Sequence, residues 1–157
     1  AELDTLLLDS FEAFELPARE KGIALSVRLP EESLAPCLCD RDRISQALAI
    51  LIQNALSYHR ADGDDRFVAL SLEADGRWFL LTVADNGPGI PDSEKESVFE
   101  RFYRCDVSRR QKDHFGLGLS IAGEIIAAHG GRLRLKDTKG GGASFTIWLP
   151  ATSDSPS

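Results

Sequence analysis

The sequence predicts an α+β domain, a two-layer α/β sandwich in which three helices cover one side of a mixed sheet of about five strands. Three segments, residues 4–21, 41–59 and 117–129, carry apolar side chains at helical spacing. The other apolar segments are short and rich in β-branched or aromatic residues, as strands are. Most connections are also short, which places consecutive elements side by side.

Composition indicates one globular domain. The chain has 157 residues, of which 43% are hydrophobic, enough to bury about two-thirds of the surface that the unfolded chain exposes. Its formal net charge of −7 argues against binding nucleic acid through a broad basic face. Any contact with phosphate is therefore expected to be local.

The chain is expected to be a soluble module of a longer protein. It contains no Met, even at position 1, and no apolar run approaches the ~18 residues of a membrane-spanning helix. Its three cysteines, without a spacing suited to a zinc site, indicate a reducing compartment. We interpret Cys37 and Cys39 as small core residues on one face of a short strand near residues 36–39.

The first helix, residues 4–21, is expected to cover the sheet and to end at Gly22. Residues 23–29 alternate apolar and polar side chains, as a half-buried strand does, and Pro30 ends that strand. The second helix, residues 41–59, is expected to be capped by Asp40 and to carry Asn54 at the edge of its apolar face.

Asn54 is a candidate site residue. An Asn late in an apolar helix lowers helix propensity, so its amide is expected to bind something specific. From this residue alone, a core Asn bonded to the backbone and an Asn that binds a ligand are both open interpretations.

Residues 67–73 and 77–84 are predicted to form two antiparallel strands, the second ending at a carboxylate, Asp85. A buried carboxylate needs a hydrogen-bond partner, and the glycines that follow let the backbone turn sharply and approach a ligand. An ordinary hairpin tip is the alternative, because Asn-Gly after a strand favours a hairpin. Residues 92–104, which are charged and aromatic, do not resemble a returning strand.

Residues 91–115 form a long polar and aromatic segment, here called the lid, of a size that is usually functional or disordered. Without nucleotide, the lid is expected to be the least ordered part of the chain, especially at residues 106–112. The third helix is predicted to open at Gly116-Leu117-Gly118-Leu119, where uncovered backbone N–H groups and the helix dipole would favour a phosphate. A glycine-rich helix start is also common without any ligand. Strands at residues 132–136 and 144–149 and a disordered tail at 151–157 complete the chain.

The order of these motifs resembles that of the ATP-binding domain of sensor histidine kinases, in the Bergerat-fold or GHKL ATPase superfamily. The resemblance covers residues 3–150. The N box resembles residues 44–55, the G1 box 85–90 and the F box 98–104, while the G2 box resembles 115–121 and the last strand of the family resembles 142–150. The F box favours the histidine-kinase branch.

The resemblance implies that the domain binds ATP and Mg²⁺ beneath the lid. Asn54 would be the metal ligand, through a hard amide oxygen. Asp85 would accept a hydrogen bond from the adenine amine, Tyr58 would pack against the base, and Gly116 and Gly118 would present N–H groups to the phosphates. The implied cofactor-binding residues are Asn54, Tyr58, Asp85, Gly87, Gly89, Ile90, Phe102, Gly116, Leu117, Gly118 and Leu119. The implied catalytic residues are Asn54, Arg101 and Arg104, with one of the arginines approaching the terminal phosphate as the lid closes.

Four positions depart from the family pattern. Ile50 replaces a polar residue, Ser57 a Lys that contacts phosphate, His114 a glycine, and Ala143 a Thr that supports the adenine-binding Asp. Each lost charge-assisted contact is expected to weaken ATP binding by about 10- to 100-fold.

The resemblance implies a protein histidine kinase that transfers the γ-phosphoryl group to a His on a separate helical-hairpin domain of the same protein. An Asp of a response regulator would then receive it. Such a full-length protein is expected to be homodimeric and membrane-anchored, with this domain cytoplasmic and monomeric by itself. The alternatives are a degenerate nucleotide-binding or regulatory module, an ATP-hydrolysing clamp and a serine kinase. Ile50 disfavours the clamp, because clamp-type members use a Glu of the N box to activate water.

Overall fold

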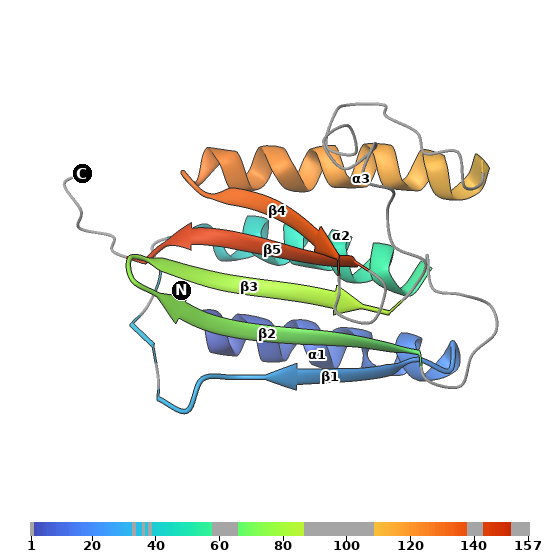
Figure 1. The fold of residues 1–157 in the computed structure, drawn as a ribbon, viewed down its shortest axis with the longest axis horizontal. Helices are drawn as coiled ribbons and strands as arrows, with labels where there is room; N and C mark the ends of the chain where they lie inside the picture. The colour runs from blue at the N-terminus through green and yellow to red at the C-terminus, as the bar shows by residue number, and fades with distance from the viewer. Residues whose placement is uncertain are drawn as a thin grey trace.

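A computed structural model describes residues 2–32, 34–35, 37, 39–57, 66–86, 109–137 and 143–151, and for residues 57, 109–118 and 137 the backbone alone. Three helices and five strands form this part of the chain (Figure 1). The helices are α1 (Leu3–Glu20), α2 (Arg41–Ser57) and α3 (Arg109–Ala128). The strands are β1 (Ala24–Arg28), β2 (Phe67–Asp75), β3 (Trp78–Asp85), β4 (Arg132–Asp137) and β5 (Ala143–Pro150).

The strands form one mixed sheet in the order β1-β2-β3-β5-β4. β1 runs parallel to β2, and the other three pairs are antiparallel. The last described strand, β5, therefore lies between β3 and β4. Thr82 of β3 faces Thr146 of β5, and their Oγ1 atoms are 3.1 Å apart. This mixed five-stranded sheet confirms the predicted fold class.

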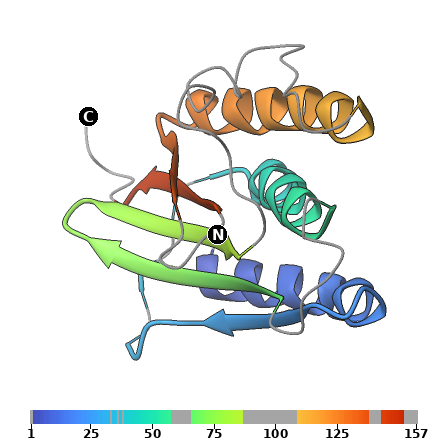
Figure 2. The same cartoon turned by 45° about the vertical axis from the view of Figure 1, so that its right-hand side comes forward.

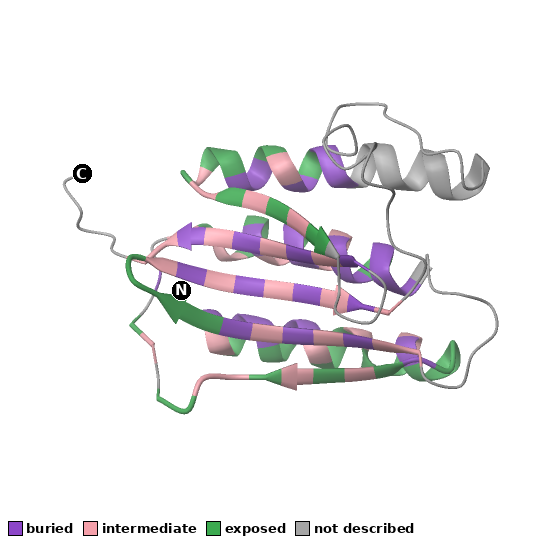
Figure 3. Ribbon diagram, in the orientation of Figure 1, coloured by how far each residue is buried: buried purple, intermediate pink, exposed green. Residues whose placement is uncertain are grey.

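The helices lie side by side on one face of the sheet, as the turned view shows (Figure 2). β3 and β5 alternate buried and half-buried residues along their length, and β2 does so until its last three residues, which are exposed (Figure 3). The buried side meets the helices and forms the core, which stabilises the fold by removing apolar surface from water. Its largest fully buried side chains are Leu6, Leu7, Ile44, Leu48, Leu51, Ile52, Leu70, Leu72, Leu81, Leu119, Ile126 and Ile147.

Two predicted helix boundaries rest on the residues that the sequence indicated. Gly22 follows α1 with a φ of 72°, the left-handed conformation that glycine adopts readily at a helix end. Asp40 caps α2, because its Oδ1 accepts hydrogen bonds from the backbone N–H groups of Asp42, at 3.1 Å, and Arg43, at 3.3 Å. Among the described helices, none combines the length and the hydropathy that a membrane span requires.

The short strand predicted near residues 36–39 is wrong, since Cys37 and Cys39 lie outside any strand. Cys37 lies beside the end of β5, where its thiol donates to the Pro150 carbonyl at 3.7 Å. Cys37 is nevertheless a core residue, only 1% exposed. Burial, and then the neighbouring Cys39, raise the pKa of the Cys37 thiol to about 12, which leaves it unreactive.

The predicted start of the third helix is also wrong. α3 begins at Arg109, so Gly116 and Gly118 lie inside the helix and not at its N-terminus. Residues 109–112 are Arg, Arg, Gln and Lys, which all favour helix, and they extend α3 through the glycines. The helical backbone includes the end of the predicted lid, while residues 87–108 lie outside the described residues.

His129 joins the end of α3 to the start of α2. Its Nδ1 lies 2.8 Å from the carbonyl of Ile125, and its Nε2 accepts the backbone N–H of Asp40 at 3.1 Å. A carbonyl can only accept and a backbone N–H can only donate, so this pair of contacts requires the neutral ring with its proton on Nδ1. His129 thereby holds the cap residue of α2 against the end of α3.

We expect His129→Ala to lower the free energy of unfolding by about 1–2 kcal/mol, since it removes two hydrogen bonds worth about 0.5–1.5 kcal/mol each. Urea denaturation of both proteins measures the difference. Ala128→Ser, an exposed change in the same turn, should cost no more than about 0.5 kcal/mol. Equal stabilities for His129→Ala and the parent would show that the contact with Asp40 contributes nothing.

Candidate functional site

Three of the motifs identified in the sequence lie at one end of the domain. The C-terminal ends of α2 and β3 and the N-terminal end of α3 all lie on the right in Figure 1. Asn54 is in the last turn of α2, and Asp85 is the last residue of β3. Leu119, at the start of the described side chains of α3, is fully buried.

Asp85 lies on the helix-facing side of the sheet. It continues the buried series of Phe79, Leu81 and Val83 along β3, and it is 8% exposed. Its Oδ1 accepts the backbone N–H of Ala143, across the sheet at the start of β5, at 3.4 Å. The carboxylate therefore has a protein donor even though position 143 carries no hydroxyl side chain. A hairpin tip would place this carboxylate in solvent, where it could not select a ligand.

Asn86 has a role that the sequence alone did not reveal. Its Oδ1 accepts the backbone N–H of Phe67 at 2.9 Å, so it joins the end of β3 to the start of β2. The available signal was an Asn directly after a strand, since Asn side chains often bond to nearby backbone groups. This contact holds the backbone in place immediately after Asp85.

Asn54 is buried without a partner. It is 2% exposed, and neither its Oδ1 nor its Nδ2 has a hydrogen-bond partner in the described part of the chain. This disfavours the interpretation as a core Asn bonded to the backbone. An unpaired buried amide costs about 1–3 kcal/mol per group, so a residue of this kind points to a ligand.

The donor set of Asn54 fits Mg²⁺. An amide oxygen is a hard ligand of the type that Mg²⁺ accepts together with water and phosphate oxygens. No group of three or more His, Cys, Asp or Glu among the described residues could hold a metal ion. Among the described residues, Asn54 is therefore the one that would hold such a metal, together with oxygens from water and from phosphate.

The other predicted site residues fall into two groups. Gly116, Leu117 and Gly118 are helical, and their backbone N–H groups lie within α3, where such groups bond to carbonyls four residues earlier. The second group lies outside the described residues and comprises Tyr58, Gly87, Gly89, Ile90, Arg101, Phe102 and Arg104.

Known proteins show the same combination of fold and motifs. Residues 39–153 match the family described as histidine kinase-, DNA gyrase B-, and HSP90-like ATPase. The sensor protein CiaH of Streptococcus pneumoniae is 41% identical over 149 residues, which are 94% of this chain and 32% of that protein.

Solved structures of the histidine kinase ThkA and of ShkA are similar to this one. The catalytic domain of ThkA matches with a TM-score of 0.81 and 29% identity over 97% of this chain and 95% of that chain. ThkA in complex with the response regulator protein TrrA matches with a TM-score of 0.79 and 28% identity, over 99% and 42%. Full-length ShkA in complex with AMPPNP matches with a TM-score of 0.80 and 30% identity, over 100% and 32%.

The chain belongs to the family of histidine kinase-, DNA gyrase B- and HSP90-like ATPases. Within this family its relatives include the sensor histidine kinase WalK of Bacillus subtilis, which is 35% identical over 93% of this chain and 23% of that protein, and its fold is that of a histidine kinase catalytic domain. It spans about a third or less of the length of the curated relatives that it matches.

Proposed function

We propose that this domain binds Mg-ATP between α2 and α3 and supplies the γ-phosphoryl group for a histidine kinase reaction. The observation that carries the proposal is the buried amide of Asn54, which has no partner, at the same end of the domain as the buried carboxylate of Asp85. The domain proposed to do this spans residues 1–150, with the lid at about 91–115. A structure of ShkA with AMPPNP supports nucleotide binding by this fold.

Asp85 is the proposed determinant of base specificity. A carboxylate accepts hydrogen bonds only, so it matches the exocyclic amine of adenine and repels the carbonyl that guanine carries there. The contact with Ala143 leaves the carboxylate further acceptor capacity for a base. Tyr58, Gly87, Gly89, Ile90 and Phe102 are proposed to complete the base pocket.

Asn54 is proposed to hold Mg²⁺ through Oδ1, and Mg²⁺ would supply charge neutralisation at the phosphates. The hydrogen bonds that Asn54 lacks within the protein would then be replaced by ligand contacts. Arg101 and Arg104 are proposed to stabilise the terminal phosphate.

Phosphate binding requires a change at the start of α3. Backbone N–H groups inside a helix are already bonded, so Gly116 and Gly118 can bind phosphate only if the turns that precede them unwind. Glycine lowers the cost of that change, because it is a poor helix former. We propose that nucleotide binding shortens α3 to a start near Gly116, while the fully buried Leu119 keeps the rest of the helix packed on the core.

The phosphoryl acceptor is proposed to be a His on a helical-hairpin domain of the same protein, followed by an Asp of a response regulator. The relatives are sensor histidine kinases, and ThkA has been solved with a response regulator. We propose a homodimeric, membrane-anchored sensor in which this domain is cytoplasmic and monomeric by itself. Ile50 packs against the hydrophobic core, so this position offers no carboxylate to activate water, and a hydrolysing clamp is disfavoured.

The isolated chain is expected to bind Mg-ATP but to acquire no stable phosphohistidine. Both ring nitrogens of His129 are engaged, and none of His59, His114 and His129 precedes an acid that could serve as its base. The test is incubation with γ-labelled ATP, alone and with a separately supplied helical-hairpin domain that carries the proposed phosphoacceptor His.

Acid-labile label should appear only on the added hairpin domain. Label on the isolated chain that is lost on replacing one of its three histidines would overturn the proposed acceptor. Failure to bind ATP at millimolar concentration would instead favour the second candidate function, a degenerate regulatory module. The departures from the family pattern at Ile50 and Ser57 are the reason to keep this candidate.

A further inference from the structure

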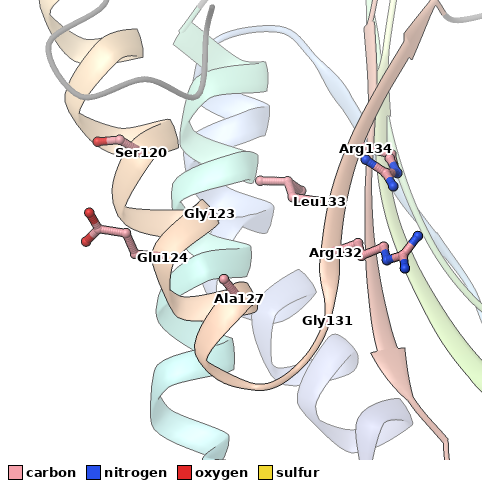
Figure 4. A pocket seen from close by; sticks show the side chains of 8 residues that line it. All are labelled: Ser120, Gly123, Glu124, Ala127, Gly131, Arg132, Leu133 and Arg134. Atoms are coloured by element: carbon pink, nitrogen blue, oxygen red, sulfur yellow. The ribbon is translucent and has the colours of Figure 1, made fainter. Parts of the chain in front are cut away.

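β4 is an edge strand with a groove beside it. It pairs with β5 and lies last in the sheet order, so within the described ranges one side of its backbone has no neighbouring strand. A groove of about 430 Å³ lies between this strand and α3 (Figure 4). Unpaired strand edges are templates on which another extended chain can add.

Small residues on α3 keep this groove open. Gly123 and Ala127 lie one turn apart on the side of the helix that lines it, and Gly131 lines its end. A Cβ atom built on Gly123 would meet no other atom within 4 Å, so the space in front of this residue is empty. A glycine in the middle of a helix costs about 0.5–1 kcal/mol relative to Ala, and packing within the described residues does not require it here.

β4 presents a different chemistry on each of its two faces. Leu133 points toward α3, whereas the side chains of Arg132 and Arg134, which also line the groove, extend to the other side of β4 (Figure 4). Their partners across the sheet, Trp148 and Thr146, are half-buried positions of β5, so this basic face is the one opposite the helices. Arg132, Arg134 and Lys136 are all exposed. The guanidinium of Arg132 is held over the ring of Trp78, 5.8 Å from its centroid, so this basic row is partly ordered in advance.

We propose that an extended segment of a partner protein adds to β4 as a further strand, with acidic side chains alternating with small apolar ones. Side chains directly across a strand pair interact, so acidic residues would face Arg132, Arg134 and Lys136 on the open face. The intervening residues would point into the groove beside Leu133, against Gly123 and Ala127.

Charge selects this occupant. A second copy pairing through its own β4 would oppose this basic row with an identical one, which is unfavourable. Glu124 is one of the α3 residues that line the groove, so acidic side chains are disfavoured at the positions that point inward. The basic row and the lining of the groove together therefore favour acidic side chains on one face of the added strand and apolar side chains on the other.

This inference concerns a surface remote in sequence from Asn54 and Asp85 and does not rest on ATP binding.

A capped hexapeptide of alternating Glu and Val, kept below the concentration at which it associates with itself, tests the proposal without nucleotide. Two controls are a peptide of three Glu followed by three Val and a peptide of alternating Lys and Val. Titration calorimetry should give at least tenfold tighter binding for the alternating acidic peptide. Backbone amide shifts should be largest along β4 and residues 120–127. Equal binding of all three peptides, no binding at millimolar concentration, or shifts located elsewhere would overturn the proposal.

Two variants make the test independent of folding. Gly123→Leu fills the groove while removing a helix-interior glycine, so it should weaken peptide binding at least tenfold without lowering Tm. Ala128→Leu, exposed on the same helix but outside the groove, is its control and should bind as the parent does. The double change Arg134→Glu and Lys136→Glu leaves Arg132 on Trp78 and should transfer the preference to the Lys–Val peptide. Unchanged peptide binding by Gly123→Leu, or an unchanged preference of the double variant for the Glu–Val peptide, would refute β4 and its groove as the binding site.

Discussion

Asp85→Asn should weaken ATP binding by at least tenfold and leave the fold intact. The Asn oxygen can still accept the Ala143 N–H, which the wild-type carboxylate accepts at 3.4 Å, so the amide NH₂ would be directed at the adenine amine. Losing a charge-assisted hydrogen bond costs about 1.5–3 kcal/mol, which corresponds to about 10- to 100-fold in Kd. Titration calorimetry of both proteins with Mg-ATP measures the effect, and the discrimination between ATP and GTP should fall in parallel.

A matched control separates base recognition from net charge. Glu73→Gln removes one negative charge from an exposed position on β2, whose side chain lies on the open face of the sheet. We expect this variant to bind ATP as the wild type does. If Asp85→Asn and Glu73→Gln have equal affinities for ATP, then Asp85 has a structural role only.

Asn54→Leu is expected to stabilise the domain and to abolish Mg²⁺-dependent ATP binding. Leu has about the shape of Asn and leaves no polar atom unpaired at a position that is 2% exposed. Since neither polar atom of Asn54 has a protein partner, removing them should raise the free energy of unfolding by about 1–3 kcal/mol. Urea denaturation measures the gain, and calorimetry with Mg²⁺ or with EDTA measures the loss of metal-dependent binding.

Two further variants sharpen this experiment. Gln53→Leu, an exposed change in the adjacent position of α2, should alter stability by no more than about 0.5 kcal/mol and leave binding unchanged. Asn54→Asp retains a hard oxygen ligand and should preserve part of the Mg²⁺-dependent binding while losing stability without metal, because it buries a charge. If Asn54→Leu destabilises the domain and still binds Mg-ATP, Asn54 is an ordinary core residue.

The sequence by itself predicted the elements, because their causes are local. The alternation of residues 23–29, the turn at Gly22 and the cap at Asp40 each depend on neighbours within a few positions, and the structure has all three. The order of the motifs indicated the family, which the matched family and the relatives confirm. It also indicated Asn54 and Asp85, because a polar group at the end of an apolar element needs an explanation.

Tertiary structure decided what depends on residues distant in the chain. Cys37 has a strand-like sequence environment, but its thiol bonds to the Pro150 carbonyl at the end of β5, and the residue lies outside any strand. The start of α3 was missed for a local reason, because the helix-favouring residues 109–112 extend the helix through Gly116 and Gly118. Only the packed structure shows that Asn54 is buried without a partner, that Ala143 donates to Asp85, and that Gly123 leaves a groove beside β4. These hydrogen bonds and this groove depend on groups that are distant in the sequence, so the periodicity of the sequence cannot predict them.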